Sequence, residues 1–419
     1  MPTRSHQGCW TCKTRRRRCD NTRPACRNCE QRGVACEGYE VRLRWGAGIA
    51  SRDVMTASDE PGSSPGQATS SDEALFNEFL RSGINVLHST TAQESMLQPR
   101  LPELCRESSA LYTTCLAFQL SLAPSLTPRF FEYFDAALRT FRSELACSTT
   151  LLDGTLAAGL LLCSIGLMHG FPWTVHLEGM HNILLEDLHR PSTPSKFRTH
   201  LLEVMGVMDL PIFAIGRQTP CIEIWRRYCL RAEPRRGVEP VSGLPRALLD
   251  MFAGIGFETT EQSFWDWPGH SGSFLQCYLW EAYRLAGILT LRQQARLPGN
   301  QQSPNVSAWR QPGACPADAT ILVARILANL DALRLACAER PEEDTFILNA
   351  KNYPLFVAGL EITVLRPRPD WQKKIRSYLF LTRQDELILG LLEEMWRRDD
   401  PDFSVDQVAR ERGIEMGLL

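Results

Sequence analysis

Apolar residues recur every three or four positions along most of the chain after residue 73. Three stretches show this spacing most clearly: Leu75, Phe76, Phe79, Leu80, Ile84 and Leu87; Phe130, Phe131, Phe134, Leu138 and Phe141; and Ile321, Leu322, Ala324, Ile326, Leu327 and Leu330. Such a period gathers apolar side chains on one face of an α-helix. Strict alternation of apolar and polar residues is rare, so few strands are expected. We therefore predict one large all-α domain over residues 73–419, called the body below.

Three features of the body refine this picture. The longest apolar run, residues 156–168, has 13 residues, fewer than the roughly 20 that span a bilayer, so we expect a buried helix and no membrane association. Residues 191–197, 231–245 and 294–318 are rich in Pro, Gly or Ser and are predicted loops. From Asp385 onward there are 10 acidic and 4 basic residues. Leucines at helical spacing there favour a final amphipathic helix over an acidic activation segment.

The first 72 residues have a different composition. Residues 46–72 are small, polar and rich in Pro and Gly, which predicts a flexible linker. Residues 1–45, called the head below, hold 11 Lys/Arg and 4 Asp/Glu, a balance of +7. The remaining residues hold 35 Lys/Arg and 44 Asp/Glu, a balance of −9, so the whole chain has a net charge of −2. A basic head on an acidic body predicts a polyanionic partner for the head, and nucleic acid fits best.

Six of the 15 cysteines lie in the head, as two copies of Cys-x2-Cys-x6-Cys shifted by 17 residues. These cysteines are Cys9, Cys12, Cys19, Cys26, Cys29 and Cys36. Structural zinc takes four ligands, so two zinc ions need eight bonds from six thiolates. Two cysteines must then bridge, and the repeat requires one from each half.

Other uses of these cysteines fit less well. One four-cysteine zinc site with two spare thiols would ignore the 17-residue repeat. A disulfide framework needs an oxidising compartment, whereas the first residues lack the apolar segment of a secretory signal. A redox role for the Cys-x2-Cys pairs would need a βαβ context. We therefore expect an intracellular, thiol-reduced protein with a zinc-stabilised head.

The stretch GCWTCKTRRRRCDNTRPACRNCEQRGVACEGYE (residues 8–40) resembles the DNA-binding unit of the fungal binuclear zinc cluster transcription factors. The match covers the six cysteines, the basic run and Pro24, which corresponds to the loop proline that joins the two halves in that family. The resemblance implies two short helices with loops around two zinc ions. It also implies that Cys9 and Cys26 bridge the metals, that Cys12 and Cys19 complete one zinc site, and that Cys29 and Cys36 complete the other.

Five positive charges lie between Cys12 and Cys19. The resemblance places a helix there in the major groove to read a CGG-like triplet. Arg15 and Arg16 match the base-contacting basic pair, since an arginine can donate two hydrogen bonds to guanine. Lys13, Arg17 and Arg18 resemble backbone contacts. A nuclear-import signal is the plainer interpretation of the arginine run, and it is compatible with DNA binding. Arg42 and Arg44 are equally well explained as phosphate contacts or as solvated side chains.

The body resembles, more diffusely, the fungal-specific regulatory domain that accompanies such clusters, at residues 160–185, 241–255 and 352–362. His169, His176, His181 and His189 lack the spacing of a metal site, so we expect structural or surface roles for them. The other nine cysteines are expected to be small core residues. No catalytic motif is apparent, which predicts that the protein is not an enzyme.

The sequence therefore predicts a nuclear transcription factor of mainly α fold that binds double-stranded DNA through a head containing two zinc ions. We expect it to regulate transcription of the genes of a metabolic pathway by RNA polymerase II. Transcriptional co-regulators or a small-molecule effector of the body are further candidate partners. No leucine heptad follows the head, which leaves monomer and homodimer open. The alternative is a zinc-stabilised interaction protein or corepressor that acts through protein partners.

Overall fold

The computed structural model describes residues 9, 11–12, 15, 17, 19–20, 22, 25–36, 70–89, 96–147, 150–187, 195–230, 237–296, 318–339, 346–398 and 403–419. The chain forms two compact units, residues 1–61 and residues 62–419. The first contains the head and the second contains the body.

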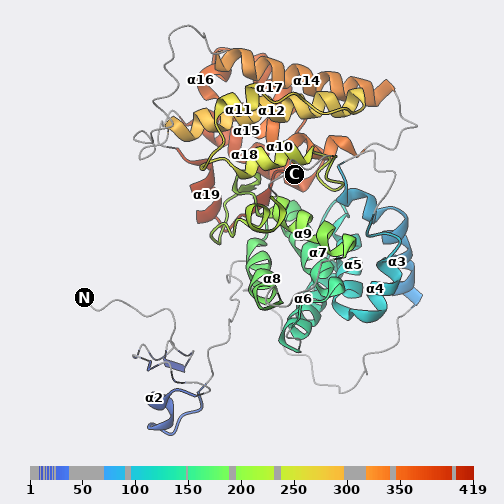
Figure 1. The fold of residues 1–419 in the computed structure, drawn as a ribbon, viewed down its shortest axis with the longest axis vertical. Helices are drawn as coiled ribbons and strands as arrows, with labels where there is room; N and C mark the ends of the chain where they lie inside the picture. Colours follow the sequence, from blue (N-terminus) through green and yellow to red (C-terminus); the bar gives the residue numbers. More distant parts are fainter. Residues whose placement is uncertain are drawn as a thin grey trace. The chain divides into compact units, whose positions relative to one another are not determined.

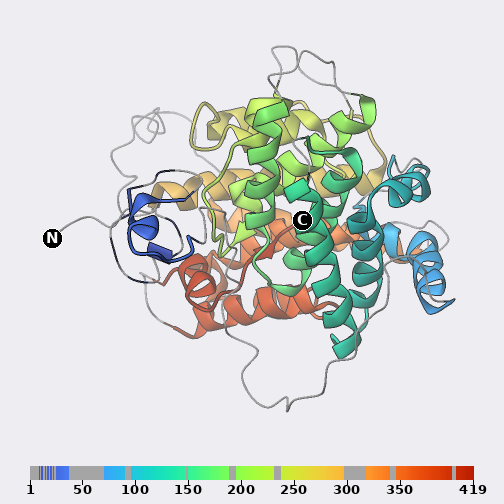
Figure 2. The same cartoon turned by 90° about the horizontal axis from the view of Figure 1, so that it is seen from below.

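The second unit is built from helices joined by loops (Figures 1 and 2). Its elements up to residue 229 are, in chain order, α3 (Ser70–Arg81), η1 (Gly83–Leu87), α4 (Leu101–Glu107), α5 (Ser109–Ser121), α6 (Pro128–Cys147), α7 (Asp153–His169), α8 (Thr174–Asp187), α9 (Lys196–Asp209), η2 (Pro211–Phe213), β1 (Ala214–Ile215) and the π-helix η3 (Trp225–Cys229). The remaining elements are α10 (Arg246–Ala253), α11 (Glu261–Trp265), α12 (Phe274–Arg296), α14 (Ala319–Glu339), η4 (Ile347–Lys351), α15 (Asn352–Gly359), α16 (Ile362–Leu365), α17 (Pro369–Arg376), α18 (Arg383–Arg397), α19 (Val405–Glu411) and β2 (Met416–Gly417).

The prediction of a mainly α fold with few strands is confirmed. In the described part of the chain, the strands are two-residue segments, and β1 pairs antiparallel with β2, with Ala214 opposite Gly417. None of the described helices combines the length and the apolar character needed to cross a bilayer.

The long apolar run forms a buried helix, as expected. Residues 154–166 of α7 are all buried, and α7 packs against α5, α6, α8 and α9. The helix ends at Gly170, whose φ of +76° lies in the left-handed region that glycine adopts without a steric penalty. A helix that is apolar on every face requires this complete enclosure.

Aromatic rings form the centre of the second half of the body. The rings of Phe213 and Tyr353 meet edge to face at 4.9 Å, and the rings of Phe252 and Tyr353 at 5.5 Å. The Tyr283 hydroxyl donates to the backbone carbonyl of Ala350 at 2.8 Å. Buried tyrosines need such partners for their hydroxyl groups. Tyr283 belongs to the long helix α12 and Tyr353 to α15, and these two helices pack against each other and against α14 (Figure 1).

The predicted boundaries need local correction. Helix α9 begins at Lys196, inside the predicted loop 191–197, because the Ser195 hydroxyl accepts a hydrogen bond from the Arg198 N–H at 3.0 Å and caps the helix. Helix α12 extends to Arg296, past the predicted loop start at 294. Helix α3 begins at Ser70, inside the predicted linker. Linker residues 46–69 lie outside the described residues.

The acidic segment after residue 385 contains the predicted helix. In α18, Leu391, Leu392 and Met395 are buried. The helix begins with a capping box, in which the Thr382 hydroxyl accepts from the Asp385 N–H and the Asp385 carboxylate accepts from the Thr382 N–H. Two donors at the helix N-terminus are thereby satisfied.

Candidate metal centre and nucleic-acid interface

The two halves of the head repeat the same local geometry. The Cys12 N–H donates to the Cys9 sulfur at 3.4 Å, and the Cys29 N–H donates to the Cys26 sulfur at 3.3 Å. The longer-range contacts repeat as well, because the Cys9 N–H donates to the Cys19 sulfur at 3.3 Å and the Cys26 N–H to the Cys36 sulfur at 3.4 Å. The 17-residue sequence repeat is therefore also a structural repeat.

Short helical segments carry the Cys-x2-Cys pairs. In the first half, Thr11 and Cys12 are helical, and the Arg15 N–H donates to the Thr11 carbonyl at 3.1 Å. In the second half, α2 (Arg27–Glu30) follows Cys26, whose sulfur accepts a hydrogen bond from the Cys29 N–H and caps the helix. Helices this short do not persist alone in water, so the cysteine centre must support them.

The six sulfur atoms form two groups of four. One group contains Cys9, Cys12, Cys19 and Cys26, the other contains Cys9, Cys26, Cys29 and Cys36, and all ligand atoms within a group lie within 4.8 Å of one another. The groups therefore share Cys9 and Cys26, whose sulfurs are 3.5 Å apart.

The sulfur spacings suit zinc. A tetrahedron with metal–sulfur bonds of about 2.3 Å has sulfurs about 3.8 Å apart. The Cys12 and Cys26 sulfurs of the first group are 3.7 Å apart, and the Cys9 and Cys29 sulfurs of the second group are 3.8 Å apart. These separations exclude disulfide bonds between these cysteines, and the cysteines in the described part of the chain are all free thiols.

Burial controls the protonation of the central thiols. Cys9 and Cys26 are fully inaccessible to solvent. Loss of hydration raises the pKa of Cys26 to about 12 and also raises the pKa of Cys9 and Cys12. Thiols with raised pKa values keep their protons at neutral pH, so a metal must displace those protons when it binds.

Asp20 connects the first half of the head to the second. Its carboxylate accepts hydrogen bonds from the backbone N–H groups of Arg27 at 3.2 Å and Asn28 at 3.4 Å, in the first turn of α2. The Thr22 hydroxyl also donates to Asp20, and this bond is the main reason why the pKa of Asp20 is lowered to about 2. Sequence reasoning did not single out Asp20, although its position directly after a ligand cysteine was a usable signal.

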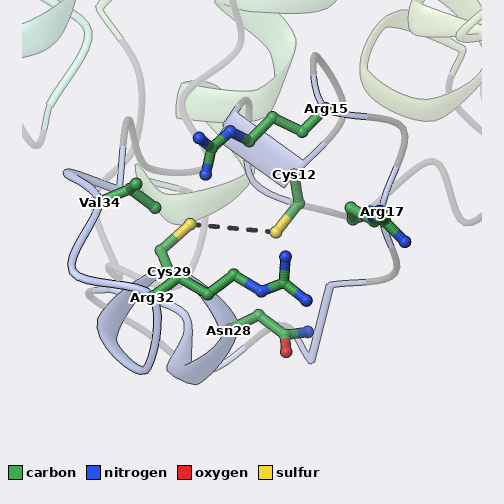
Figure 3. Close-up of a pocket in the computed structure, with 7 residues that line it drawn as sticks. All are labelled: Cys12, Arg15, Arg17, Asn28, Cys29, Arg32 and Val34. Carbon is green, nitrogen blue, oxygen red and sulfur yellow. Dashed lines mark hydrogen bonds between the residues drawn. The ribbon is translucent and has the colours of Figure 1, made fainter.

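Of the five basic residues between Cys12 and Cys19, the structure describes two. Arg15 and Arg17 are exposed, and the Arg17 N–H donates to the Cys12 carbonyl at 2.9 Å. Arg15 and Arg17 line one cavity together with Arg32 of the second half (Figure 3). The other predicted DNA contacts, Lys13, Arg16 and Arg18, lie outside the described residues, and so do Pro24, Arg42 and Arg44.

The body histidines occupy separate environments. The Nε2 atom of His181 lies 2.9 Å from the Tyr228 hydroxyl. His176 is buried edge-on against Phe141 at 6.0 Å, and burial lowers its pKa to about 4. His169 stacks against Phe171. Among the residues that the structure describes, the metal-like groups are the two sulfur groups of the head. His189 lies outside the described residues.

A family model describes the head. Residues 7–46 match the fungal Zn(2)-Cys(6) binuclear cluster domain. The chain is also 50% identical over 42 residues to the transcription factor phomR of Diaporthe leptostromiformis, a match that covers 10% of this chain and 7% of that protein. It is 43% identical over 57 residues to the pestheic acid cluster transcriptional regulator 3 of Pestalotiopsis fici, covering 13% of this chain and 10% of the relative.

A yeast protein also matches over a short stretch of the chain. The arginine metabolism regulation protein II of Saccharomyces cerevisiae is 47% identical over 38 residues, or 9% of this chain and 4% of the relative. The chain thus matches a tenth or less of the length of each of these relatives. No solved structure matches the chain. The repeated cysteine geometry and these matches agree, and residues 7–46 therefore belong to the fungal Zn(2)-Cys(6) binuclear cluster family, whose domain binds two zinc ions.

Proposed function

We propose that the protein is a pathway-specific transcription factor that acts in the nucleus by binding double-stranded DNA through its head. The observation that carries the proposal is the pair of four-sulfur groups sharing Cys9 and Cys26, with the exposed cations Arg15 and Arg17 beside them. The relatives named above are transcription regulators by their names, which supports the same class. The proposal assigns the protein no catalytic role.

Each cysteine has a defined place in the proposed centre. Cys9 and Cys26 would each ligate both zinc ions, Cys12 and Cys19 would complete one site, and Cys29 and Cys36 would complete the other. Zinc supplies the folding energy that a unit of this size lacks, because its sulfur ligands are assembled in the folded chain and not in the unfolded chain. The protein holds the sulfurs in place through the backbone N–H donors of Cys9, Cys12, Cys26 and Cys29.

The basic segment between Cys12 and Cys19 is the proposed DNA reader. Arg15 and Arg16 would contact base edges of a CGG-like triplet, since an arginine fork fits guanine O6 and N7. Lys13, Arg17 and Arg18 would contact phosphates and set the position of the head on the duplex. The exposure of Arg15 and Arg17 is compatible with both roles.

We also propose that three parts of the chain have different functions. Residues 1–45 bind DNA, residues 46–72 connect, and residues 73–419 regulate transcription by RNA polymerase II through a co-regulator or a small-molecule effector. The support is the separation into two compact units and the large helical core of the second.

The test is selection of binding sites from a random duplex library by the full-length, zinc-loaded protein. A recovered guanine-containing triplet would support the proposal and would also report the number of half-sites. The matched control is Cys26→Ser, which should recover no consensus because a bridging ligand is missing. A zinc-loaded wild type that recovers no consensus and binds all duplexes equally weakly would refute DNA reading and favour an interaction protein.

A further inference from the structure

The cavity beside the sulfur centre contains cations from both halves of the head. It has a volume of about 270 Å³ and is lined by Cys12, Arg15, Arg17, Asn28, Cys29, Arg32 and Val34 (Figure 3). None of the seven described residues that line it is acidic. Arg32 follows α2 and is exposed. An arginine of the second half therefore lies with two arginines of the proposed DNA reader.

The lining residues follow the 17-residue repeat of the head. Cys12 is the repeat partner of Cys29, and their sulfurs are 3.9 Å apart. Arg15 is the partner of Arg32, and the two side chains lie on opposite sides of the Cys12–Cys29 contact in Figure 3. Because both pairs line one cavity, the cavity lies at the pseudo-twofold axis that relates the halves.

The third repeat pair is asymmetric. Arg17 corresponds to Val34 across the repeat, and both line the cavity. The first half thus contributes two guanidinium groups and the second half contributes one. The cavity has a cationic side at Arg17 and an apolar side at Val34, so an anion bound there is attracted toward the first half.

We propose that Arg32 and Arg17 hold one phosphate group of the DNA backbone in this cavity, at the edge of the groove that Arg15 enters. The inference rests on the proposed function and extends it, because it assigns a DNA contact to the second half of the head. Guanidinium groups bind phosphate through two parallel hydrogen bonds, and the Asn28 amide lines the same cavity as a further polar group.

The formal charge of the metal centre does not oppose this assignment. Six thiolates and two zinc ions carry −2, and the three arginines of the cavity carry +3. The positive groups lie outermost, since Arg15, Arg17 and Arg32 are exposed whereas Cys12 and Cys29 are buried. A phosphate that approaches from solvent therefore meets the guanidinium groups before the sulfurs.

The experiment compares Arg32→Gln with Arg27→Gln in the full-length, zinc-loaded protein. Arg27 is the matched control because it is an exposed arginine of the same half that does not line the cavity. Binding to the selected duplex and to a duplex with a mutated triplet is measured between 0.05 and 0.3 M salt. A lost phosphate contact lowers the slope of log K against log[salt] by about 0.9 in magnitude, which amounts to about fivefold weaker binding near 0.15 M.

We expect this loss for Arg32→Gln on both duplexes, little change for Arg27→Gln, and partial rescue by Arg32→Lys, which keeps the charge but lacks the fork. Native mass spectrometry should still find two zinc ions in Arg32→Gln. A zinc loss in that variant would show that Arg32 supports the metal centre instead, and would overturn the proposal.

Two further outcomes separate this inference from the proposed function. Equal salt slopes for Arg32→Gln and Arg27→Gln, with wild-type binding intact, would refute the phosphate contact and leave the proposed function standing. Absence of duplex binding by the wild type would refute both. Inorganic phosphate at constant ionic strength should weaken wild-type binding more than Arg32→Gln binding. Tight phosphate binding to wild type with no effect on DNA affinity would identify a free-phosphate site and overturn the assignment to the backbone.

Discussion

The carboxylate of Asp20 accepts a hydrogen bond from the backbone N–H of Arg27 at 3.2 Å. Asp20 directly follows the last cysteine of the first half, and Arg27 is the first residue of α2 in the second half. The first residues of a helix have N–H groups without helical partners, and a carboxylate at that end is favoured by the helix dipole. One side chain of the first half therefore stabilises the helix that carries two thiols of the second.

Replacement of Asp20 should loosen the second half of the head. In Asp20→Ala the N–H groups of Arg27 and Asn28 lose their carboxylate partner, so we expect faster transfer of zinc to a chelator than in the wild type. The control is Glu30→Ala, which removes the same charge from the last residue of α2. Transfer is followed with a coloured chelator, and equal rates for the two variants would contradict a capping role for Asp20.

The shared cysteines predict an unequal response to substitution. Because Cys9 belongs to both sulfur groups and Cys12 to one, Cys9→Ser should lose both zinc ions, whereas Cys12→Ser should retain about one. Native mass spectrometry of the full-length protein counts the metals, with two expected in the wild type. Cys105→Ser, in the body, should keep both. One zinc in the wild type, or equal losses in Cys9→Ser and Cys12→Ser, would argue against the bridged arrangement.

Substitution of two arginines of the proposed DNA reader should affect DNA binding in different ways. Arg16→Ala should cost about 1–3 kcal/mol on the selected site and weaken the preference for guanine, because a base contact is lost. Arg18→Ala should weaken binding to all sequences alike and reduce the salt slope by about one. Titrations against matched and mutated triplets at two salt concentrations separate these effects. Equal losses on both duplexes for Arg16→Ala would make it a backbone contact.

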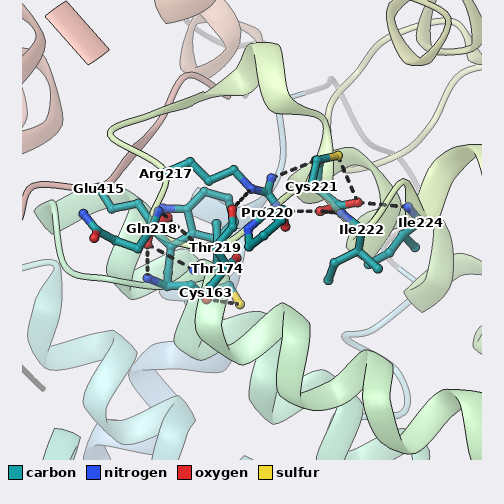
Figure 4. Close-up of polar contacts among 12 residues, drawn as sticks. Cys163, Thr174, Arg217, Gln218, Thr219, Pro220, Cys221, Ile222, Ile224 and Glu415 are labelled. Carbon is teal, nitrogen blue, oxygen red and sulfur yellow. Dashed lines mark hydrogen bonds and ion pairs between the residues drawn. The ribbon is translucent and has the colours of Figure 1, made fainter. Parts of the chain in front are cut away.

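Glu415 should be essential for stability of the body. Its fully buried carboxylate accepts from the Thr174 N–H at 3.2 Å and from the Thr174 hydroxyl at 2.6 Å (Figure 4). It accepts as well from the Trp173 N–H at 2.7 Å. It also accepts from the Gln218 N–H at 2.8 Å. Glu415→Ala leaves these donors buried without their partner, which should lower the free energy of unfolding by about 2–4 kcal/mol.

The matched control for this prediction is Glu411→Ala. Glu411 is exposed and accepts from Gln407 on the same helix, so its loss should change stability by less than about 0.5 kcal/mol. Urea unfolding followed by tryptophan fluorescence measures both variants. A Glu415→Ala variant within that smaller range would show that water replaces the lost contacts.

Acid should destabilise the body through His176. Burial lowers its pKa in the folded state to about 4, against 6.5 for the exposed imidazole. Below pH 6.5 the unfolded chain therefore binds a proton that the folded chain rejects, and stability falls as the pH falls from about 6.5 to 4. Between pH 7 and pH 5 this one group should account for about 2 kcal/mol.

His176→Gln removes that titration. The variant should start less stable at pH 7, because a well-packed ring is replaced, but it should lose about 2 kcal/mol less than the wild type on going to pH 5. Denaturant unfolding at the two pH values gives the difference directly. Parallel losses in wild type and variant would mean that His176 already carries its proton in the folded protein.

Local sequence patterns were sufficient to predict the metal centre. The 17-residue repeat of Cys-x2-Cys-x6-Cys predicted a centre of two zinc ions, because ligands three or seven residues apart are held close by the chain itself. Which cysteines bridge the metals was implied by the resemblance to the binuclear cluster family. The helical period of the body and the buried run at residues 156–168 were equally predictable, since each depends on residues one or two turns apart. The start of α9 at Lys196 was not predicted, because it depends on one hydroxyl group, that of the N-cap residue Ser195, inside a segment with the composition of a loop.

Contacts between distant residues were decided by the tertiary structure. Asp20 caps a helix seven residues away in the other half, and Glu415 binds Thr174 from 241 residues away. Arg32 joins Arg15 and Arg17 because the halves fold about a common axis, although its place in the repeat marked it as the partner of Arg15. The sequence alone determined the local elements, which are the helices of the body and the repeated cysteine pattern of the head, because neighbours along the chain restrict one another directly. The pairing of distant polar groups depends on how the whole core packs, which no local pattern encodes.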